Sequence, residues 1–86
     1  MGKAIDRELL ERLCRSPQQQ VALIVTVDGD PQCYQNTVEA FGLRVKRTFL
    51  LTRQLALTGS ACDFLALSRE SWVLKMEEDK PIQAMD

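Results

Sequence analysis

The chain has 86 residues, of which 45% are hydrophobic and 27% are charged, and its 11 Lys and Arg against 12 Asp and Glu give a net charge of -1. This length allows one domain, and this composition is typical of a globular protein rather than a disordered one. Nucleic acid is normally bound through a concentrated basic surface, so we expect no nucleic-acid partner. Histidine is absent, which excludes Ser-His-Asp triads, Cys-His pairs and HExxH zinc helices. We therefore expect a binding protein and not an enzyme.

The three cysteines, Cys14, Cys33 and Cys62, form no CxxC motif. An odd number of dispersed cysteines favours reduced thiols over a disulfide framework or a zinc site, so we expect neither a metal nor a cofactor. The N-terminus opens without the apolar run of a secretion signal, and the longest apolar run, Val21 to Val27, is too short to cross a membrane. We expect a soluble, cytoplasmic protein with no membrane partner, unless the chain is a fragment of a longer precursor.

Residues 4–15 show the spacing of an amphipathic helix. The apolar residues Ile5, Leu9 and Leu13 recur on one side, with charged residues between them. Pro17 ends the helix, because the residue before a proline is driven out of the α conformation. An isolated helix of this length is marginal in water. We expect these three side chains to be buried against the rest of the domain or in a homodimer.

The next segment predicts a strand, a turn and a helix. Val21 to Val27 is rich in β-branched residues and almost continuously apolar, as in a central strand covered on both faces. Asp30 and Pro31 suit the N-cap and the first position of a helix, and Gly42 suits its C-terminal end. The buried stripe of this helix is expected to hold Tyr34, Val38 and Phe41.

From Leu43 the period of hydrophobicity changes to two, which predicts a second strand. One face is predicted to carry Leu43, Val45, Phe49 and Leu51, and the other Arg44, Lys46, Thr48 and Thr52. Arg47 interrupts the apolar face, which indicates an edge strand with a bulge or local exposure. Leu55 to Thr58 is predicted to be a third strand.

A second helix and a last strand complete the predicted order. Ser60, with Asp63 three residues later, is a capping pattern that opens a helix over residues 61–68. Trp72 to Glu77 alternates as a fourth strand, which the acidic run up to Asp79 ends. We expect one face of this strand to carry Trp72, Leu74 and Met76.

The order is therefore a helix followed by β-α-β-β-α-β, which predicts an α+β, ferredoxin-like domain. Right-handed crossovers place the two helices on one face of a four-stranded antiparallel sheet. Residues 1–20 form the N-terminal helix and connector, residues 21–79 the domain, and residues 80–86 a tail. The second face of the sheet is then solvated, covered by the N-terminal helix, or used for binding.

Four segments in this order resemble one known family. They are Val21 to Gly29, Val38 to Phe49, Leu55 to Leu67 and Trp72 to Asp79, and the Glu-Glu-Asp at the end of the last is the most distinctive part. Together they look like the propeptides of subtilisin-like serine proteases and the related stand-alone proteinase inhibitors.

The resemblance implies an inhibitor or intramolecular chaperone of a subtilisin-like protease. The open sheet face would pack on two surface helices of the protease, whose N-termini favour carboxylates. The tail would lie in the substrate cleft as an added strand, with Met85 in the primary specificity pocket. The residues implied are Glu78 and Asp79 as helix caps, and Ile82, Gln83, Ala84 and Met85 as the tail in the cleft.

Two plainer interpretations stay open. The carboxylates of residues 77–79 could simply be solvated charges that end an edge strand and discourage aggregation. The domain could also be an interaction or regulatory adaptor unrelated to proteases, because this scaffold carries many functions.

Overall fold

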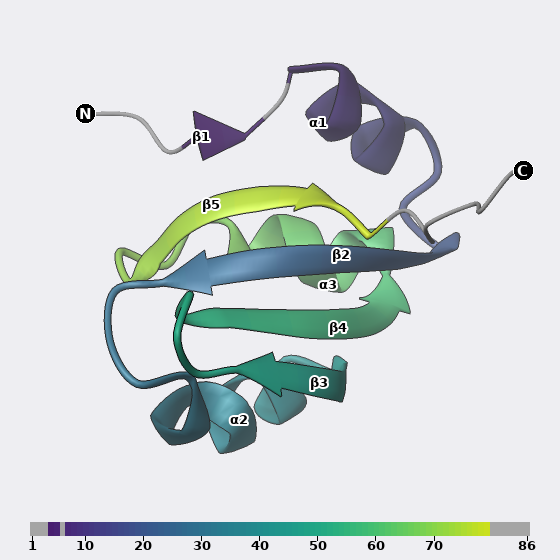
Figure 1. Cartoon of the computed structure of the whole chain (residues 1–86). Helices are drawn as coiled ribbons and strands as arrows, with labels where there is room; N and C mark the ends of the chain where they lie inside the picture. The colour runs from purple at the N-terminus through teal and green to yellow at the C-terminus, as the bar shows by residue number, and fades with distance from the viewer. Residues whose placement is uncertain (1–3, 6, 80–86) are drawn as a thin grey trace, which may run out of the picture.

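The computed structural model of the protein describes residues 4–5 and 7–79 (Figure 1). Its elements are β1 (Ala4–Ile5), α1 (Arg7–Arg15), β2 (Gln20–Val27), α2 (Pro31–Ala40), β3 (Arg44–Phe49), β4 (Gln54–Ser60), α3 (Ala61–Leu67) and β5 (Val73–Glu78).

The described strands form one sheet with the order β1-β5-β2-β4-β3. The pairs β2–β5, β2–β4 and β3–β4 are antiparallel, and β1 pairs in parallel with β5. From β2 onward this is the β-α-β-β-α-β arrangement, with the first and third of its strands in the centre. The predicted α+β, ferredoxin-like fold is confirmed, and the apolar character of β2 follows from its central position.

The core lies between the sheet and the helices. Val38 of α2 and Phe64 of α3 are fully buried in one cluster with alternate residues of the central strands. These strand residues are Leu23, Val25, Leu55 and Leu57. Figure 1 shows α3 behind the sheet, and no helix of the described chain crosses in front of it. One face of the sheet is therefore open.

The prediction for the N-terminus was wrong at Ile5. Ala4 and Ile5 form β1, whose partners are Lys75 and Met76 on β5, and α1 begins only at Arg7. Backbone pairing with the edge of β5 outweighs the helical spacing of Ile5, since an unpaired strand edge leaves its N–H and C=O groups without partners.

The rest of the predicted helix is confirmed. Leu9 and Leu13 of α1 are 4% and 2% exposed and belong to the core cluster. The helix α1 lies against α3. The two leucines are therefore buried within the chain itself.

The predicted caps of α2 and α3 are present. The Asp30 carboxylate accepts a hydrogen bond from the Gln32 N–H at 2.9 Å, and the Ser60 hydroxyl accepts one from the Asp63 N–H at 3.3 Å. Gly42 follows α2 with a φ of 95°. This left-handed conformation is one that glycine adopts without the steric cost of a Cβ.

The predicted bulge in β3 is present, but it changes which side chains share a face. The register shifts between Val45 and Arg47, so that Lys46 has no partner on β4. After the extra residue, Thr48 faces the helices and accepts a hydrogen bond from Gln35 of α2 at 2.7 Å. The predicted grouping of Phe49 with Val45 was therefore wrong. Leu51 lies outside β3, in the turn that follows.

A second irregularity changes the faces of β5. The register shifts between Thr26 and Val27, whose partners are Lys75 and Val73, and Leu74 is the extra residue. Val73 and Met76 are buried while Leu74 is exposed, so the predicted grouping of Leu74 with Met76 was wrong.

Candidate protein-binding face

The open face of the sheet consists of three rows of side chains that cross β3, β4, β2 and β5. Residues directly opposite each other on neighbouring strands point to the same side of a sheet, so the register assigns them to rows. The rows are Arg44, Thr58, Ala22 and Asp79; then Arg47, Ala56, Ile24 and Glu77; then Phe49, Gln54, Thr26 and Lys75. Asp79 joins the first row because its N–H donates to the Ala22 carbonyl at 3.0 Å, beyond the last residue of β5.

The centre of this face is low and mostly apolar. It is formed by Ala22 and Ile24 of β2 together with Ala56 and Thr58 of β4. Ala56 is only 2% exposed, although no described helix covers it. It lies between Ile24 and Arg47 in its row, and these longer side chains rise above it. A partner can therefore approach Ala56 and Ile24 closely, whereas an ion pair between Lys46 and Asp79 crosses the face over the row of Thr58 and Ala22.

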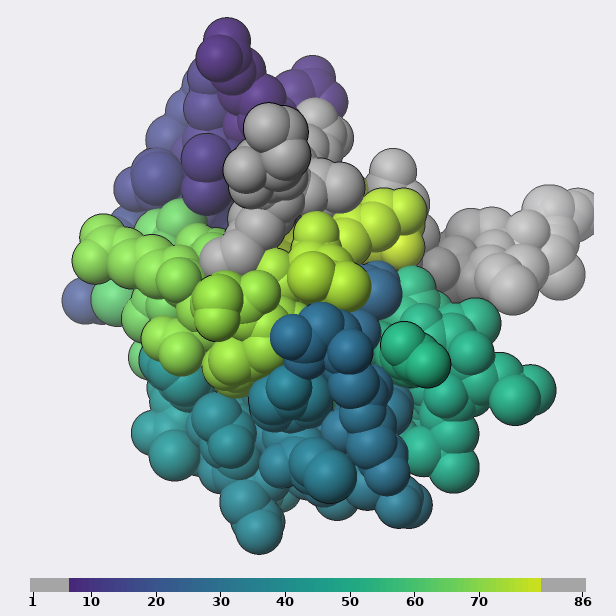
Figure 2. Space-filling view, turned by 90° about the vertical axis from the view of Figure 1, so that its left-hand side faces the viewer, coloured from purple at the N-terminus to yellow at the C-terminus, as the bar shows by residue number. Residues whose placement is uncertain are grey.

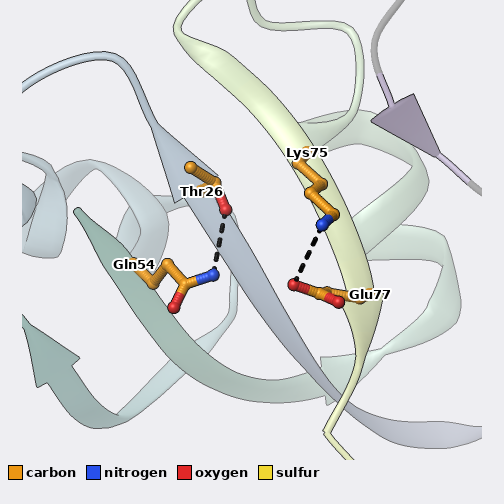
Figure 3. Close-up of polar contacts among 4 residues, drawn as sticks. All are labelled: Thr26, Gln54, Lys75 and Glu77. Carbon is orange, nitrogen blue, oxygen red and sulfur yellow. Dashed lines mark hydrogen bonds and ion pairs between the residues drawn. The ribbon is translucent and has the colours of Figure 1, made fainter. Parts of the chain in front are cut away.

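Polar contacts order the face near its third row. The Gln54 amide donates to the Thr26 hydroxyl at 3.2 Å, and the Lys75 ammonium lies 3.5 Å from the Glu77 carboxylate. Figure 3 shows these four side chains on β4, β2 and β5, standing on the same side of the sheet. The side chains at this end are thereby held in place before any partner binds.

The two edges of the face carry opposite charges. The basic edge is Arg44, Lys46 and Arg47 of β3, and the acidic edge is Glu77 and Asp79 at the end of β5. The Lys46 ammonium lies 3.6 Å from the Asp79 carboxylate, which links the two edges. Within the described chain, no carboxylate forms an ion pair with Arg44 or Arg47. These two guanidinium groups are therefore available to an acidic partner.

Exposed leucines extend one end of the molecule. Leu50 and Leu51 lie in the turn between β3 and β4, and both are exposed. In Figure 2 the teal-green atoms of the β3–β4 region form a separate lobe on the right. Two exposed leucines therefore follow Phe49 directly in the chain.

The structure places Glu78 and Asp79 on opposite sides of the sheet. Glu78 lies opposite Leu23, on the helix side, and its carboxylate is 2.6 Å from the Arg12 guanidinium of α1. Glu77 lies opposite Ile24 and therefore shares the open face with Asp79. The four other predicted site residues, Ile82, Gln83, Ala84 and Met85, lie outside the described residues.

Sequence reasoning missed Glu77, Arg47 and Phe49 as members of the open face. Alternation alone would have grouped Glu77 with Asp79, two residues apart on one strand. The interruption of the apolar face at Arg47 indicates a bulge, but the sequence does not show that Lys46 is the extra residue, which turns both Arg47 and Phe49 onto this face.

A cleft lies outside the open face. A cleft of about 430 Å³ separates α1 from the adjoining ends of β2 and β5, and Arg12, Val21 and Glu78 are among its lining residues. The described residues contain no group of His, Cys, Asp or Glu arranged to hold a metal ion. No helix of the described chain is both long and apolar enough for a membrane span.

Comparison of the sequence with models of known protein families finds no match, and a search of curated proteins finds no relative. The open face is therefore the main structural basis for a functional proposal.

Proposed function

We propose that this protein binds a subtilisin-like serine protease through the open sheet face and the C-terminal tail, and that it acts as an inhibitor or folding chaperone of that protease. The observation that carries the proposal is the open face, which combines a low centre with two carboxylates on its β5 edge. The family resemblance of the sequence supplies the class of partner.

The low centre of the face suits a layer of helices. A helix packs closely on a sheet where the side chains beneath it are small, and Ala22, Ala56 and Thr58 are of this kind. Ile24 supplies the apolar contact between them. Such a surface accommodates two adjacent helices of a partner, one on each side of the Ile24 side chain.

The acidic edge suits the N-termini of those helices. Glu77 and Asp79 are two residues apart on one strand, which separates their Cα atoms by about 7 Å. Packed helices lie about 8–10 Å apart, so each carboxylate can reach a different helix. Each would accept hydrogen bonds from unpaired N–H groups and interact favourably with the helix dipole. The capping pair in this proposal is therefore Glu77 and Asp79, while Glu78 lies on the other side of the sheet, beside Arg12.

The tail begins directly after the acidic edge. The face would fix the position of Asp79 on the protease, and residues 80–86 would then continue toward the substrate cleft. An extended segment is held there by main-chain hydrogen bonds, and its alternate side chains fill pockets.

The proposal is tested by titrating a subtilisin-type protease with the full chain and measuring its residual activity. We expect inhibition that weakens by about 30–700-fold in the double variant Glu77→Gln with Asp79→Asn, which corresponds to about 1–2 kcal/mol for each of the two lost caps. Glu78→Gln is the matched control, since it removes the neighbouring charge from the other side of the strand. Its inhibition should equal that of the unchanged chain.

Two results would contradict the proposal. An intact chain that leaves several subtilisin-type proteases fully active at micromolar concentration would favour the adaptor interpretation. Equal losses from the Glu78 variant and from the double variant would mean that the open face does not make the contact.

A further inference from the structure

We propose that the open face also binds a second copy of this chain, in a symmetric dimer with its two-fold axis along the strands. This inference does not depend on the protease proposal, because it follows from the charges and the register of the face alone. At high protein concentration the dimer would cover the open face when no other partner is present.

The geometry of the rows makes the face complementary to itself. A two-fold axis that lies in the interface, parallel to the strands, carries β3 of one copy over β5 of the other. Each row then meets its own copy in reverse order. Arg44 lies over Asp79 of the second copy, Arg47 over Glu77, and Phe49 over Lys75.

All three of these edge contacts are attractive. The first two place a guanidinium against a carboxylate. These two groups can form two parallel hydrogen bonds, which makes the pair a favourable bidentate one. The third places an ammonium on an aromatic ring, which is a cation–π contact. In the described chain Arg44 and Arg47 form no ion pair with a carboxylate of their own copy. In the dimer, each of these two arginines would form an ion pair with a carboxylate of the second copy.

The middle of each row is also compatible with face-to-face packing. Ile24 and Ala56 of one copy meet Ala56 and Ile24 of the other, so a larger side chain is placed against a smaller one. Two sheets packed in this way lie about 10 Å apart, with strands within about 30° of parallel. The contact buries the apolar centre of both faces.

The size of the face sets the strength of the dimer. Four strands about 4.8 Å apart and six residues of about 3.3 Å each give a face of roughly 400 Å² per copy. This is below the range of stable interfaces, which bury at least about 1,200 Å² in total, and it is typical of weak, transient contacts. We therefore expect a dimer that forms at high micromolar concentration and dissociates when salt screens the edge charges.

Charge reversal tests this arrangement by sedimentation equilibrium at concentrations up to about 1 mM, the range in which weak contacts are populated. The first variant carries Arg44→Glu and Arg47→Glu, and the second carries Glu77→Lys and Asp79→Lys. In either variant alone like charges meet, so the dimer dissociation constant should rise at least about tenfold. A mixture of the two variants presents opposite charges along both edges again and should form a heterodimer about as tight as the original dimer.

A charge-reversed variant could fail to dimerise because it is less stable. Association of the two variants when they are mixed excludes this explanation, since it shows that both are folded. The variant Arg69→Glu with Glu39→Lys changes exposed charges away from the face and should dimerise like the unchanged chain. A chain that stays monomeric up to about 1 mM would overturn the inference. So would a dimer that both reversed variants retain, or reversed variants that do not associate when mixed. None of these measurements involves a protease, so they leave the proposed function to its own test.

Discussion

The side chain of Tyr34 connects three parts of the structure. Its hydroxyl donates a hydrogen bond to the Asp28 carboxylate at 2.6 Å, and its ring stacks on Trp72 with the centroids 4.4 Å apart. Tyr34 lies on α2, Asp28 follows β2, and Trp72 precedes β5. The hydrogen bond to Asp28 is the main cause that raises the pKa of Tyr34, with desolvation and the negative charge of Asp28 adding to it.

The phenol therefore has a testable pH dependence. Tyr34 is the only tyrosine of the chain, so its phenolate absorbance reports this group alone. We expect a pKa above the ordinary value of about 10, and we expect Asp28→Asn to lower the pKa toward that value. Because the folded state holds the proton more tightly than the unfolded state, this stabilisation is fully present below pH 10 or so and is lost as the pH rises through the folded pKa. An unchanged titration in Asp28→Asn would show that the hydrogen bond does not cause the shift.

The acidic run shows what sequence can and cannot predict about single residues. The sequence itself shows that residues 77–79 are three consecutive carboxylates. The side of the sheet to which each carboxylate points depends on the phase of β5. Leu74 is the extra residue on that strand, and its insertion changes which of the neighbouring β5 residues face the helices. Only the pairing of β5 with β2 shows that Leu74 is the extra residue.

At the scale of elements, α1 is part of the domain rather than an appendage. Leu9 and Leu13 lie in the core, and the guanidinium of Arg12 is 2.6 Å from Glu78 on β5. The ion pair is partly exposed and contributes little to stability, since exposed pairs are typically worth less than about 1 kcal/mol. The buried leucines therefore hold the helix in place.

Two leucines on this helix provide a matched pair of variants. Leu13→Ala removes a side chain that is 2% exposed and should lower the free energy of unfolding by about 2–4 kcal/mol, through lost burial and a cavity. Leu10→Ala changes a side chain that is 37% exposed and should cost within about 0.5–1 kcal/mol. Urea denaturation of both variants measures the difference. Equal, small losses would mean that α1 does not belong to the cooperative unit.

The elements that sequence reasoning missed are the ones without a local pattern. The strand β1 has two residues, Ala4 and Ile5, which is too short for any period to be visible. Its existence depends on an unpaired edge of β5, which lies about seventy residues away in the chain. By contrast, the changes of period at Gly42 and near Gly59 located the longer elements to within a few residues.

At the scale of the whole molecule, the order of elements was enough to predict the architecture. Two β-α-β crossovers of the same hand place α2 and α3 on one face, and this leaves the other face of the sheet open. The sequence could not predict how that face is arranged. The rows depend on the two bulges, which bring Arg47 opposite Ala56 and Glu77 opposite Ile24.

The proposed function assigns residues 80–86 to the substrate cleft of the protease, and truncation tests this assignment. Among the described residues, every member of the core cluster lies at or before Met76, so we predict that a chain that ends after Asp79 folds with nearly unchanged stability. The truncated chain also keeps the whole open face and should form the same weak dimer. Under the proposed function it should nevertheless inhibit a subtilisin-type protease at least about a hundredfold less well, because the main-chain hydrogen bonds of the tail are lost.

The comparison of full and truncated chains needs two measurements on each sample. Thermal unfolding, followed by circular dichroism, shows whether the domain remains intact, and titration of the protease gives the inhibition constant. The single change Met85→Gly in the full chain distinguishes the contribution of the side chain in the specificity pocket from that of the main-chain hydrogen bonds. It removes one side chain and keeps the peptide groups. We expect its inhibition constant to lie between those of the full and truncated chains. A truncated chain that inhibits as well as the full one would confine recognition to the open face and remove the tail from the proposed mechanism.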